Sequence, residues 1–375
     1  MCTAAFAALV VALPFAMSAC ASSEPSLVAT ATHGRSTIVG FMQNAEPAGW
    51  DRASDRIIIN RRGANHIWNA YSVLPNKTGL TCITCTRPSF PGVGTATQRG
   101  ASDVSPHGGY VLLTIEKGSH PGNVGSASSD PGRGVYSDIW LSTLKGEKMW
   151  QLTDIPAASN RAIIWPRFDR TGSQIVWSQM YRGIDLRHPL GQWALKIAHL
   201  VWNDGTPSLA NIRTFEPQTG KFFEPYGFSP NNQRIIFASD IDVHGGLLET
   251  AFNSQIWTID ASSLGNLQRI SPDDPTIGPF SNYNEFAFYI PGSDEVVFGR
   301  TYHSKAGGMD YWTANSDGGN YRQLTSMDQP GNRQYMGYAD AGGIAFDPKN
   351  PHRFIAGVSR GLFNERLQAI LVTIH

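Results

Sequence analysis

The chain has 375 residues, of which 41% are hydrophobic, 38 are glycine and 23 are proline. A chain of this length can bury a sizeable core, and its many turn-forming residues are typical of an all-β protein with short antiparallel strands. Its 30 basic and 30 acidic side chains balance, so the charge gives no indication of nucleic-acid binding. No apolar run beyond the N-terminal segment is long enough to span a membrane.

The N-terminal segment, residues 1–21, has features of an export signal. Its apolar stretch, residues 4–17, is too short for a membrane-spanning helix and ends in small residues. Residues 17–20 read Met-Ser-Ala-Cys and resemble a bacterial lipobox, in which Cys20 would be lipidated and become the first residue of the mature protein. The alternative is ordinary cleavage after Ala21. An export signal normally starts with a basic residue, whereas the first one here is Arg35.

Two short segments follow the export signal. Residues 22–35 are rich in Ser, Ala and Thr, and we interpret them as a tether. Residues 36–42 read Ser-Thr-Ile-Val-Gly-Phe-Met, which is a composition typical of a β-strand. No complete repeat unit surrounds this predicted strand.

The clearest repeat unit is residues 222–271, which contains four predicted strands. An apolar run ends at Phe228, the turn sequence Ser-Pro-Asn-Asn occupies 229–232, and a β-branched and aromatic run covers 234–238. This pattern predicts a β-hairpin. After a long polar loop, strands are predicted at 254–260 and 267–271.

The unit recurs along the chain, and a fixed period of this kind decides the architecture. Four copies carry a proline in the hairpin turn, namely Pro106, Pro230, Pro291 and Pro348. The intervals between them are 124, 61 and 57 residues, and the first equals two periods of 62. The turn at 168–172 marks a further copy, and a weaker first copy covers 56–82. The chain therefore contains six units.

A tryptophan recurs at an equivalent position of the predicted third strand. The four examples are Trp68, Trp140, Trp257 and Trp312. Large aromatic side chains at a repeated position favour packing between neighbouring units over ligand stacking.

The order of Ser-Pro turn, apolar strand, Ile-Trp strand, Asp-Gly-Gly turn and Arg-Gln-Leu-Thr strand resembles the WD-like repeats of the TolB-type (Tol-Pal translocation protein-like) β-propeller family. The resemblance covers residues 36–375. It implies an all-β, six-bladed β-propeller of four-stranded antiparallel blades. Because the same propeller serves periplasmic partner-binding proteins, sugar lyases and peptidase accessory domains, the resemblance indicates a fold rather than a function.

The two ends of the chain are expected to close the ring. The last copy stops at His375, immediately after its third strand. Residues 36–42 would supply the missing fourth strand, which would remove an open sheet edge that invites aggregation. The predicted organisation is therefore a signal at 1–21, a tether at 22–35 and one propeller at 36–375.

Cys82 and Cys85 leave several alternatives open. A zinc site would need further ligands, and haem attachment would need a following histidine. Cysteines three residues apart in a regular strand lie about 10 Å apart, so a disulfide requires a turn or bulge there. A structural disulfide is favoured in an exported protein, with a free pair or a redox pair as alternatives.

Four long loops are expected at one face of the ring. In a four-stranded blade, the loop between the second and third strands lies at the same face as the connection into the next blade. Loops of this length in a compact fold are more often functional than not. They cover residues 116–136, 179–192, 240–253 and 300–309.

Charged and aromatic side chains at this long-loop face are the candidate ligand-binding residues. They are His120, Arg167, Glu224, Tyr226, His244, Glu285, Tyr302, His303, Tyr338 and Asp340. Imidazoles and carboxylates bind divalent metals and perform acid/base chemistry, so His120, His244 and His303 are candidate metal ligands. The alternative is that each histidine is a solvated loop residue or a local hydrogen-bond partner.

The leading hypothesis is an exported, lipid-anchored propeller that binds a ligand or protein partner at its long-loop face. The expected partner is an envelope protein or an oligosaccharide, in the periplasm or at the cell surface, and the lipid anchor is the expected membrane contact. The alternative functions are a metal-assisted polysaccharide lyase or hydrolase and a purely structural envelope protein. The chain lacks both the His-rich motif expected of oligogalacturonide lyases and a Gly-x-Ser-x-Gly nucleophile elbow, which argues against a serine peptidase.

Overall fold

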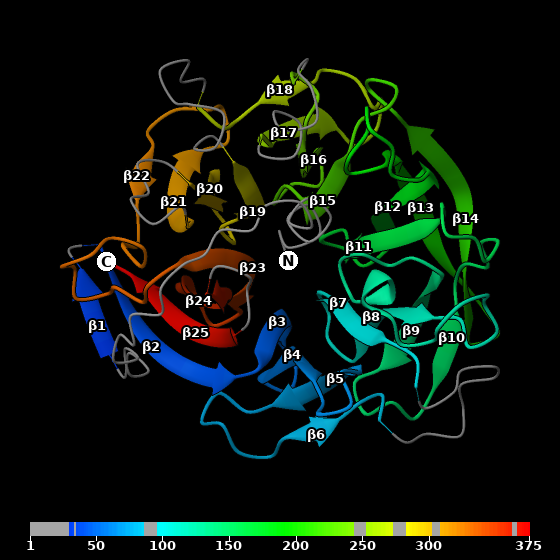
Figure 1. Ribbon diagram of the computed structural model, residues 1–375, viewed down its shortest axis with the longest axis horizontal. Helices are drawn as coiled ribbons and strands as arrows, with labels where there is room; N and C mark the ends of the chain where they lie inside the picture. Colours follow the sequence, from blue (N-terminus) through cyan, green and yellow to red (C-terminus); the bar gives the residue numbers. More distant parts are fainter. Residues whose placement is uncertain are drawn as a thin grey trace, which may run out of the picture.

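The computed structural model describes residues 30–33, 35–85, 96–243, 253–272, 283–301, 308–361 and 366–375. Six antiparallel sheets are arranged as blades around a central axis (Figure 1). The regular structure of the described residues is otherwise limited to one short 3-10 turn, η2, at Ala127–Ser129. The predicted all-β, six-bladed propeller is confirmed. Among the described residues, none forms a helix of the length and apolarity needed to cross a membrane.

Blades 1 to 5 each have four strands that follow one another from the centre outwards. Blade 1 consists of β3 (Ala45–Asp51), β4 (Arg56–Arg62), β5 (Trp68–Val73) and β6 (Thr81–Cys82). Blade 2 consists of β7 (Arg99–Val104), β8 (Tyr110–Glu116), β9 (Ser137–Thr143) and β10 (Met149–Gln151). Blade 3 consists of β11 (Ala162–Phe168), β12 (Gln174–Arg182), β13 (Gln192–Asn203) and β14 (Thr206–Phe215). Blade 4 consists of β15 (Phe223–Phe228), β16 (Arg234–Ser239), β17 (Gln255–Asp260) and β18 (Gln268–Arg269). Blade 5 consists of β19 (Asn284–Tyr289), β20 (Glu295–Arg300), β21 (Asp310–Asn315) and β22 (Arg322–Gln323).

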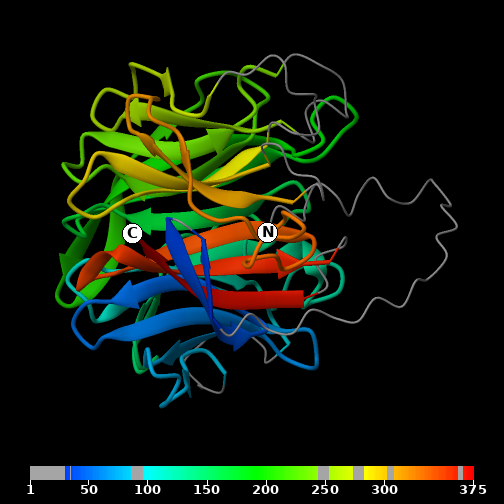
Figure 2. The ribbon, with the colours of Figure 1, turned by 90° about the vertical axis from the view of Figure 1, so that its left-hand side faces the viewer.

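Blade 6 joins the two ends of the chain. Its inner strands are β23 (Ala339–Asp347), β24 (Asn350–Arg360) and β25 (Arg366–Ile374), and β25 pairs with β2 (Ser36–Gln43) from the N-terminal side (Figure 2). The predicted closure by an N-terminal strand is confirmed. A further strand, β1 (Thr30–His33), pairs with β2, so four residues of the predicted tether belong to the sheet. The β-sheet of blade 6 therefore begins at Thr30, before the boundary predicted at residue 36.

The core lies between the blades because their strands are buried on both faces. β11 and β15 are buried at every residue, since they pack on neighbouring strands and face the ring centre. Second strands contribute fully buried aromatic side chains from the β-branched runs, including Phe237, Phe298 and Phe354. Trp68, Trp140 and Trp312 on third strands are buried, and Trp257 is half-buried against the same core, which agrees with their predicted packing role.

Every innermost strand contains a β-bulge at an equivalent place. The residues that fall outside the regular register are Ala48, Ser102, Tyr226, and the pairs Trp165 with Pro166, Phe286 with Ala287, and Gly342 with Gly343. A bulge re-aims side chains and increases the local twist. Because the bulge is repeated in all six innermost strands, the side chains of the bulged residues are directed differently from those of the regular strand residues on either side.

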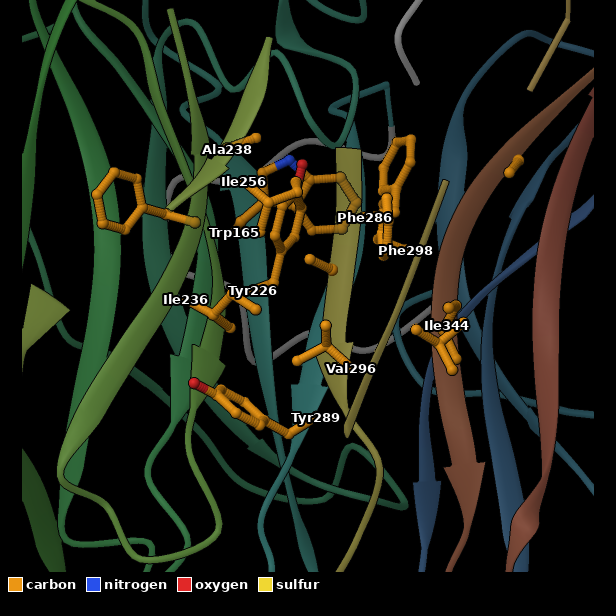
Figure 3. Close-up of a cluster of buried hydrophobic side chains, with 14 of the residues drawn as sticks. Trp165, Tyr226, Ile236, Ala238, Ile256, Phe286, Tyr289, Val296, Phe298 and Ile344 are labelled. Atoms are coloured by element: carbon orange, nitrogen blue, oxygen red, sulfur yellow. The ribbon is translucent and has the colours of Figure 1, made fainter. Parts of the chain in front are cut away.

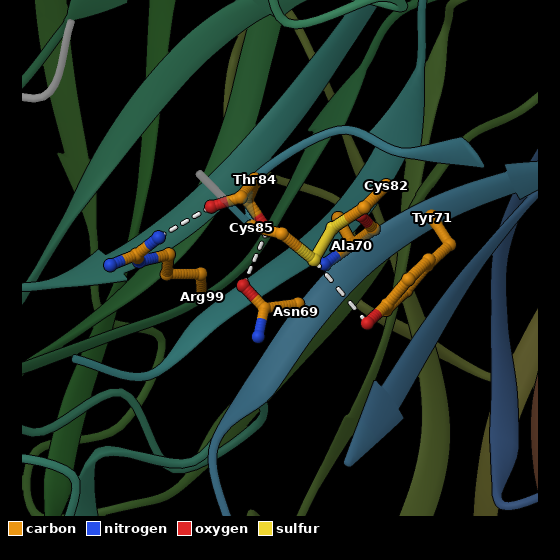
Figure 4. The surroundings of a disulfide bond; sticks show 7 residues. All are labelled: Asn69, Ala70, Tyr71, Cys82, Thr84, Cys85 and Arg99. Atoms are coloured by element: carbon orange, nitrogen blue, oxygen red, sulfur yellow. Dashed lines mark hydrogen bonds between the residues drawn. A yellow bond between two sulfur atoms is a disulfide. The ribbon is translucent and has the colours of Figure 1, made fainter. Parts of the chain in front are cut away.

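The predicted link between Cys82 and Cys85 is present as a disulfide (Figure 4). The chain leaves strand geometry after β6, so the two Cα atoms are 5.7 Å apart and within reach of a disulfide. Hydrogen bonds to Ala70 hold this bend, because its carbonyl accepts from Ile83 N–H at 2.8 Å and its N–H donates to Thr84 Oγ1 at 3.0 Å.

Candidate functional site

The candidate site lies at the ring centre, where the six innermost strands meet. These strands begin at the end of the ring that also carries the loops between second and third strands, here called the long-loop end. They finish at the opposite end, where short turns lead into the second strands, here called the short-turn end. Side chains at matching positions of the innermost strands therefore lie at matching depths.

Four carboxylates lie in the innermost strands close to the long-loop end. Each is the second residue of its innermost strand, after Ala45, Phe223, Asn284 and Ala339 respectively. The four residues are Glu46, Glu224, Glu285 and Asp340, and their exposed fractions are 3%, 6%, 2% and 8%. Blades 2 and 3 have Gly100 and Ile163 at this position, so the negative charge comes from blades 1, 4, 5 and 6.

Burial raises the pKa values of three of these carboxyl groups, those of Glu46, Glu224 and Asp340. Burial raises the pKa of Glu224 well above its ordinary value, and the charges of Glu285 and Glu46 raise it further. Blades 1 and 4 are on opposite sides of the ring, so the interaction between Glu46 and Glu224 crosses the centre. Burial also raises the pKa of Glu46, and it raises that of Asp340 to about 7. Both effects disfavour the ionised form.

The carboxylates differ in their hydrogen bonding. The Tyr283 hydroxyl donates a hydrogen bond to Glu285 Oε1. Glu46 Oε2, by contrast, is buried and has no hydrogen-bond partner among the described residues. An unpaired buried carboxylate oxygen is costly, so this atom is a candidate for contact with a ligand.

Three aromatic side chains lie at the level of the bulges (Figure 3). Trp165 and Phe286 meet edge to face with centroids 6.2 Å apart, and the rings of Tyr226 and Phe286 are 5.9 Å apart. Trp165 and Phe286 have positive φ angles of 52° and 54°, which is uncommon for large side chains. Strained backbone is often found at functional sites, so we consider this aromatic group part of the candidate site.

Arg167 lies beside the aromatic group and is 4% exposed. Its guanidinium is 5.0 Å from the ring centroid of Trp165 and 5.1 Å from that of Phe288. It donates a hydrogen bond to the Ser102 carbonyl, whereas its Nε has no partner among the described residues. Burial lowers the pKa of Arg167, while the nearby charges of Asp103 and Glu224 raise it. An arginine remains charged under these conditions.

A cavity of about 390 Å³ opens at the short-turn end. All six innermost strands and the turns that follow them line it, from Ala48 in blade 1 to Phe346 in blade 6. Arg167 and Tyr226 reach this cavity, whereas none of the four carboxylates does. The ring centre therefore has a carboxylate group at one end and a cavity at the other.

His120 is a local hydrogen-bond partner within its loop, which is one of the two alternatives expected from the sequence. Its ring is buried and stacks on Tyr136, with centroids 4.0 Å apart. Its Nε2 is 2.8 Å from Glu116 Oε1 and its Nδ1 is 2.8 Å from the Pro121 carbonyl. With both nitrogens engaged, His120 organises its own loop instead of presenting a free metal ligand. The described residues contain no group of three or more side chains suited to a metal ion.

The remaining candidates divide into two groups. Arg167, Glu224, Tyr226, Glu285 and Asp340 all lie at the ring centre, with Tyr338 immediately before β23. His244, Tyr302 and His303 lie outside the described residues.

Glu46 was missed by the sequence analysis although a signal was present. Residues 46–50 read Glu-Pro-Ala-Gly-Trp, and residues 224–228 read Glu-Pro-Tyr-Gly-Phe. The two segments occupy the same place in β3 and β15, so the shared Glu-Pro-x-Gly-aromatic pattern identifies equivalent residues. The cavity had no such signal, because its lining comes from every blade.

No family model matches this chain, and a search of curated proteins finds no match either. Among solved structures, TolB from Acinetobacter baumannii is similar with a TM-score of 0.49 and 10% identity, over 91% of this chain and 63% of that one. A protein assigned as TolB from Agrobacterium tumefaciens has a TM-score of 0.49 and 15% identity, over 91% and 98%. Puromycin hydrolase has a TM-score of 0.48 and 14% identity, over 90% of this chain and 50% of that one. This chain thus spans less than two thirds of the length of the Acinetobacter baumannii protein and half of the length of puromycin hydrolase.

Proposed function

We propose that this TolB-like six-bladed propeller is an exported binding protein that holds a cationic group of its ligand or protein partner at the long-loop end of the ring. The four buried carboxylates carry the proposal. Burial raises the pKa values of Glu46, Glu224 and Asp340, and neighbouring carboxylates raise those of Glu224 and Asp340 further. Buried carboxylates of this kind destabilise a fold when ionised, and strongly shifted pKa values are concentrated at functional sites. A cation between them would remove the repulsion and supply Glu46 Oε2 with a donor.

An organic cation fits these residues better than a metal ion or an anion. The described residues include no cluster with metal-binding geometry. Ammonium and guanidinium groups donate several charge-assisted hydrogen bonds, which suits carboxylates contributed by different blades. The same negative charge would repel an acidic oligosaccharide. We therefore favour a lysine or arginine side chain of an envelope protein.

Two features support export as part of this proposal. Residues 1–21 have the pattern of an export signal, with Cys20 as the candidate lipidation site. The disulfide between Cys82 and Cys85 is of a kind that persists in oxidising compartments such as the periplasm and the cell surface.

A lyase or hydrolase is the second candidate, because one observation favours it. Glu224 has a strongly raised pKa and interacts with the neighbouring Glu285. A carboxylic acid that keeps its proton near neutral pH beside a second carboxylate is the arrangement used for general acid and general base catalysis. Under this alternative, an oligosaccharide incubated with the protein would be cleaved, and Glu224→Gln would abolish the cleavage.

Calorimetric titration of the full chain with tetralysine tests the binding proposal. We expect binding that strengthens from pH 5 to pH 8, with protons released, because the cation binds the ionised carboxylates. Glu224→Gln and Glu285→Gln should each weaken it by about tenfold, the loss expected for one charge-assisted hydrogen bond. The exposed Glu147 provides the matched control, since Glu147→Gln should bind as the unchanged protein does. Absence of binding at every pH would refute the proposal.

A further inference from the structure

We propose that the cavity at the short-turn end is a second binding site, which accepts a small organic carboxylate with an apolar or aromatic body. This site differs from the cation site in position and in charge. It contains none of the four carboxylates, and its lining combines cationic side chains with apolar walls.

Arg167 would be the principal partner of the ligand carboxylate. Its side chain is buried, lines the cavity and keeps an Nε–H without a hydrogen-bond partner among the described residues. A buried donor without an acceptor costs free energy, and guanidinium groups bind carboxylates through paired, charge-assisted hydrogen bonds. The contacts with Trp165 and Phe288 hold the guanidinium plane in position.

The other cations of the lining are more available than its acids. Arg52 and Arg170 are exposed, and Arg170 uses Nη2 for the Phe228 carbonyl at 3.2 Å. Asp169 already accepts hydrogen bonds from the N–H groups of Ser173 and Gln174, at 2.8 and 3.0 Å, within its own turn. The acids therefore stabilise the turns of the protein, while the guanidinium groups remain able to bind an anion.

Asp103 is the other acid of the lining, and it is occupied in the same way. Its two oxygens accept from the N–H groups of Val104 and Phe168, at 2.9 and 2.8 Å. This carboxylate links β7 to β11 and is not directed to a ligand. Counting three arginines against two acids leaves the lining with one net positive charge, before any contribution from His107.

Apolar side chains form the walls around these charges. They are Val104, Phe228, Ile236, Phe288, Ile344 and Phe346. A cavity of about 390 Å³ has the size of a small-molecule site, in which apolar walls contribute affinity and a few polar groups fix the orientation. Inorganic anions would leave these walls without contact, so an amphipathic carboxylate fits better.

Calorimetric titration of the full chain with 4-phenylbutyrate, its neutral amide 4-phenylbutyramide and inorganic phosphate tests this inference. We expect 4-phenylbutyrate to bind and the amide to bind at least about tenfold more weakly, because the amide lacks the negative charge and the second acceptor oxygen that pair with Arg167. Phosphate should also bind more weakly, since it gains nothing from the apolar walls. Equal affinity for acid and amide, tighter binding of phosphate, or no binding of the acid would overturn the proposal.

Variants locate the site and separate it from the proposed cation site. Arg167→Gln should weaken the binding of 4-phenylbutyrate by about tenfold or more, and Arg52→Gln should weaken it by a smaller factor. Because Arg52 is exposed, its replacement should not affect folding. Arg182→Gln, an exposed change at the long-loop end, should have no effect. If both single variants keep the affinity for 4-phenylbutyrate, this site is contradicted. If Arg167→Gln does not fold, unchanged affinity in Arg52→Gln is sufficient to contradict it. Tetralysine binding tests the cation site at the long-loop end, and 4-phenylbutyrate binding tests the cavity at the short-turn end. One proposal can therefore be refuted while the other is supported.

Discussion

Asp340 illustrates how burial at the ring centre makes one side chain sensitive to pH. Its ordinary pKa is 3.8, and burial raises it to about 7 in the folded protein. The folded state therefore binds the proton more tightly than the unfolded state does. The stabilising effect is complete below about pH 4 and is lost as the pH rises towards 7, and Glu46 and Glu224 act in the same direction.

We expect Asp340→Asn to remove part of this pH dependence. At pH 8 the variant should be more stable than the unchanged protein by about 1–3 kcal/mol, since one pKa unit corresponds to about 1.4 kcal/mol. At pH 4.5 the difference should be much smaller. Urea unfolding at several pH values measures it, with Glu147→Gln as an exposed control. Parallel pH profiles for Asp340→Asn and the unchanged protein would show that burial of this carboxyl carries no cost.

His120 lies in a loop that is ordered by buried hydrogen bonds. The preceding strand β8 ends at Glu116, which accepts from the Gln98 N–H at 2.8 Å and from the Gly125 N–H at 2.9 Å. The imidazole joins this hydrogen-bond network. The loop is therefore ordered by buried polar contacts, which the spacing of histidines along the chain does not reveal.

At the scale of elements, ring closure depends on one strand. β2 buries Ile38 and Phe41 and pairs with β25 along most of its length, so it contributes both apolar contacts and backbone hydrogen bonds. Its contacts extend to blade 5, because Ser36 donates to the Leu324 carbonyl and Gln334 Nε2 donates to the Ser36 carbonyl at 3.1 Å. The strand thus fastens blade 6 to its neighbour.

Deleting residues 36–42 should therefore lower the thermal midpoint strongly, because it exposes the edge of β25 and leaves buried polar groups unpaired. Deleting residues 22–29, which precede β1, should leave the midpoint within a few degrees of the original. Differential scanning calorimetry on both proteins makes the comparison. Similar midpoints in the two would mean that the ring does not need this strand.

At the scale of the whole molecule, the charged side chains at the ring centre differ between its two ends. Carboxylates from four blades lie near the long-loop end, and three arginines line the cavity at the short-turn end. The balanced charge of the whole chain gives no indication of this difference. A propeller anchored to a membrane through its N-terminal segment would present the two ends to different partners.

The anchor itself is tested through Cys20. If residues 17–20 are a lipobox, the mature protein should fractionate with membranes, and Cys20→Ser should release it while the propeller stays folded. Lipid is added only to that cysteine, so mass spectrometry of the N-terminus distinguishes the cases directly. A mature protein that begins at Ser22 without modification would exclude the anchor.

The architecture could be predicted from the amino-acid sequence alone. Turn prolines at regular intervals, strand runs such as residues 234–238 and repeated tryptophans are local signals, and blades 1 to 5 each form from consecutive residues. The last repeat lacks a fourth strand and residues 36–42 form a strand outside any repeat, so these two local signals together predicted ring closure. Even Glu46 was recoverable from the sequence, because its Glu-Pro-x-Gly-aromatic segment repeats that of Glu224.

The packing of the blades against one another sets which of the candidate residues meet and where a cavity forms. Side chains at the ring centre come from six blades that are far apart in the chain, and their depths depend on bulges such as those at Trp165 and Phe286. The cavity at the short-turn end follows from the combined shape of all six strand ends, whereas the sequence directed attention to the long loops. Burial, which raises the pKa of Glu224, likewise arises only when the blades close around it.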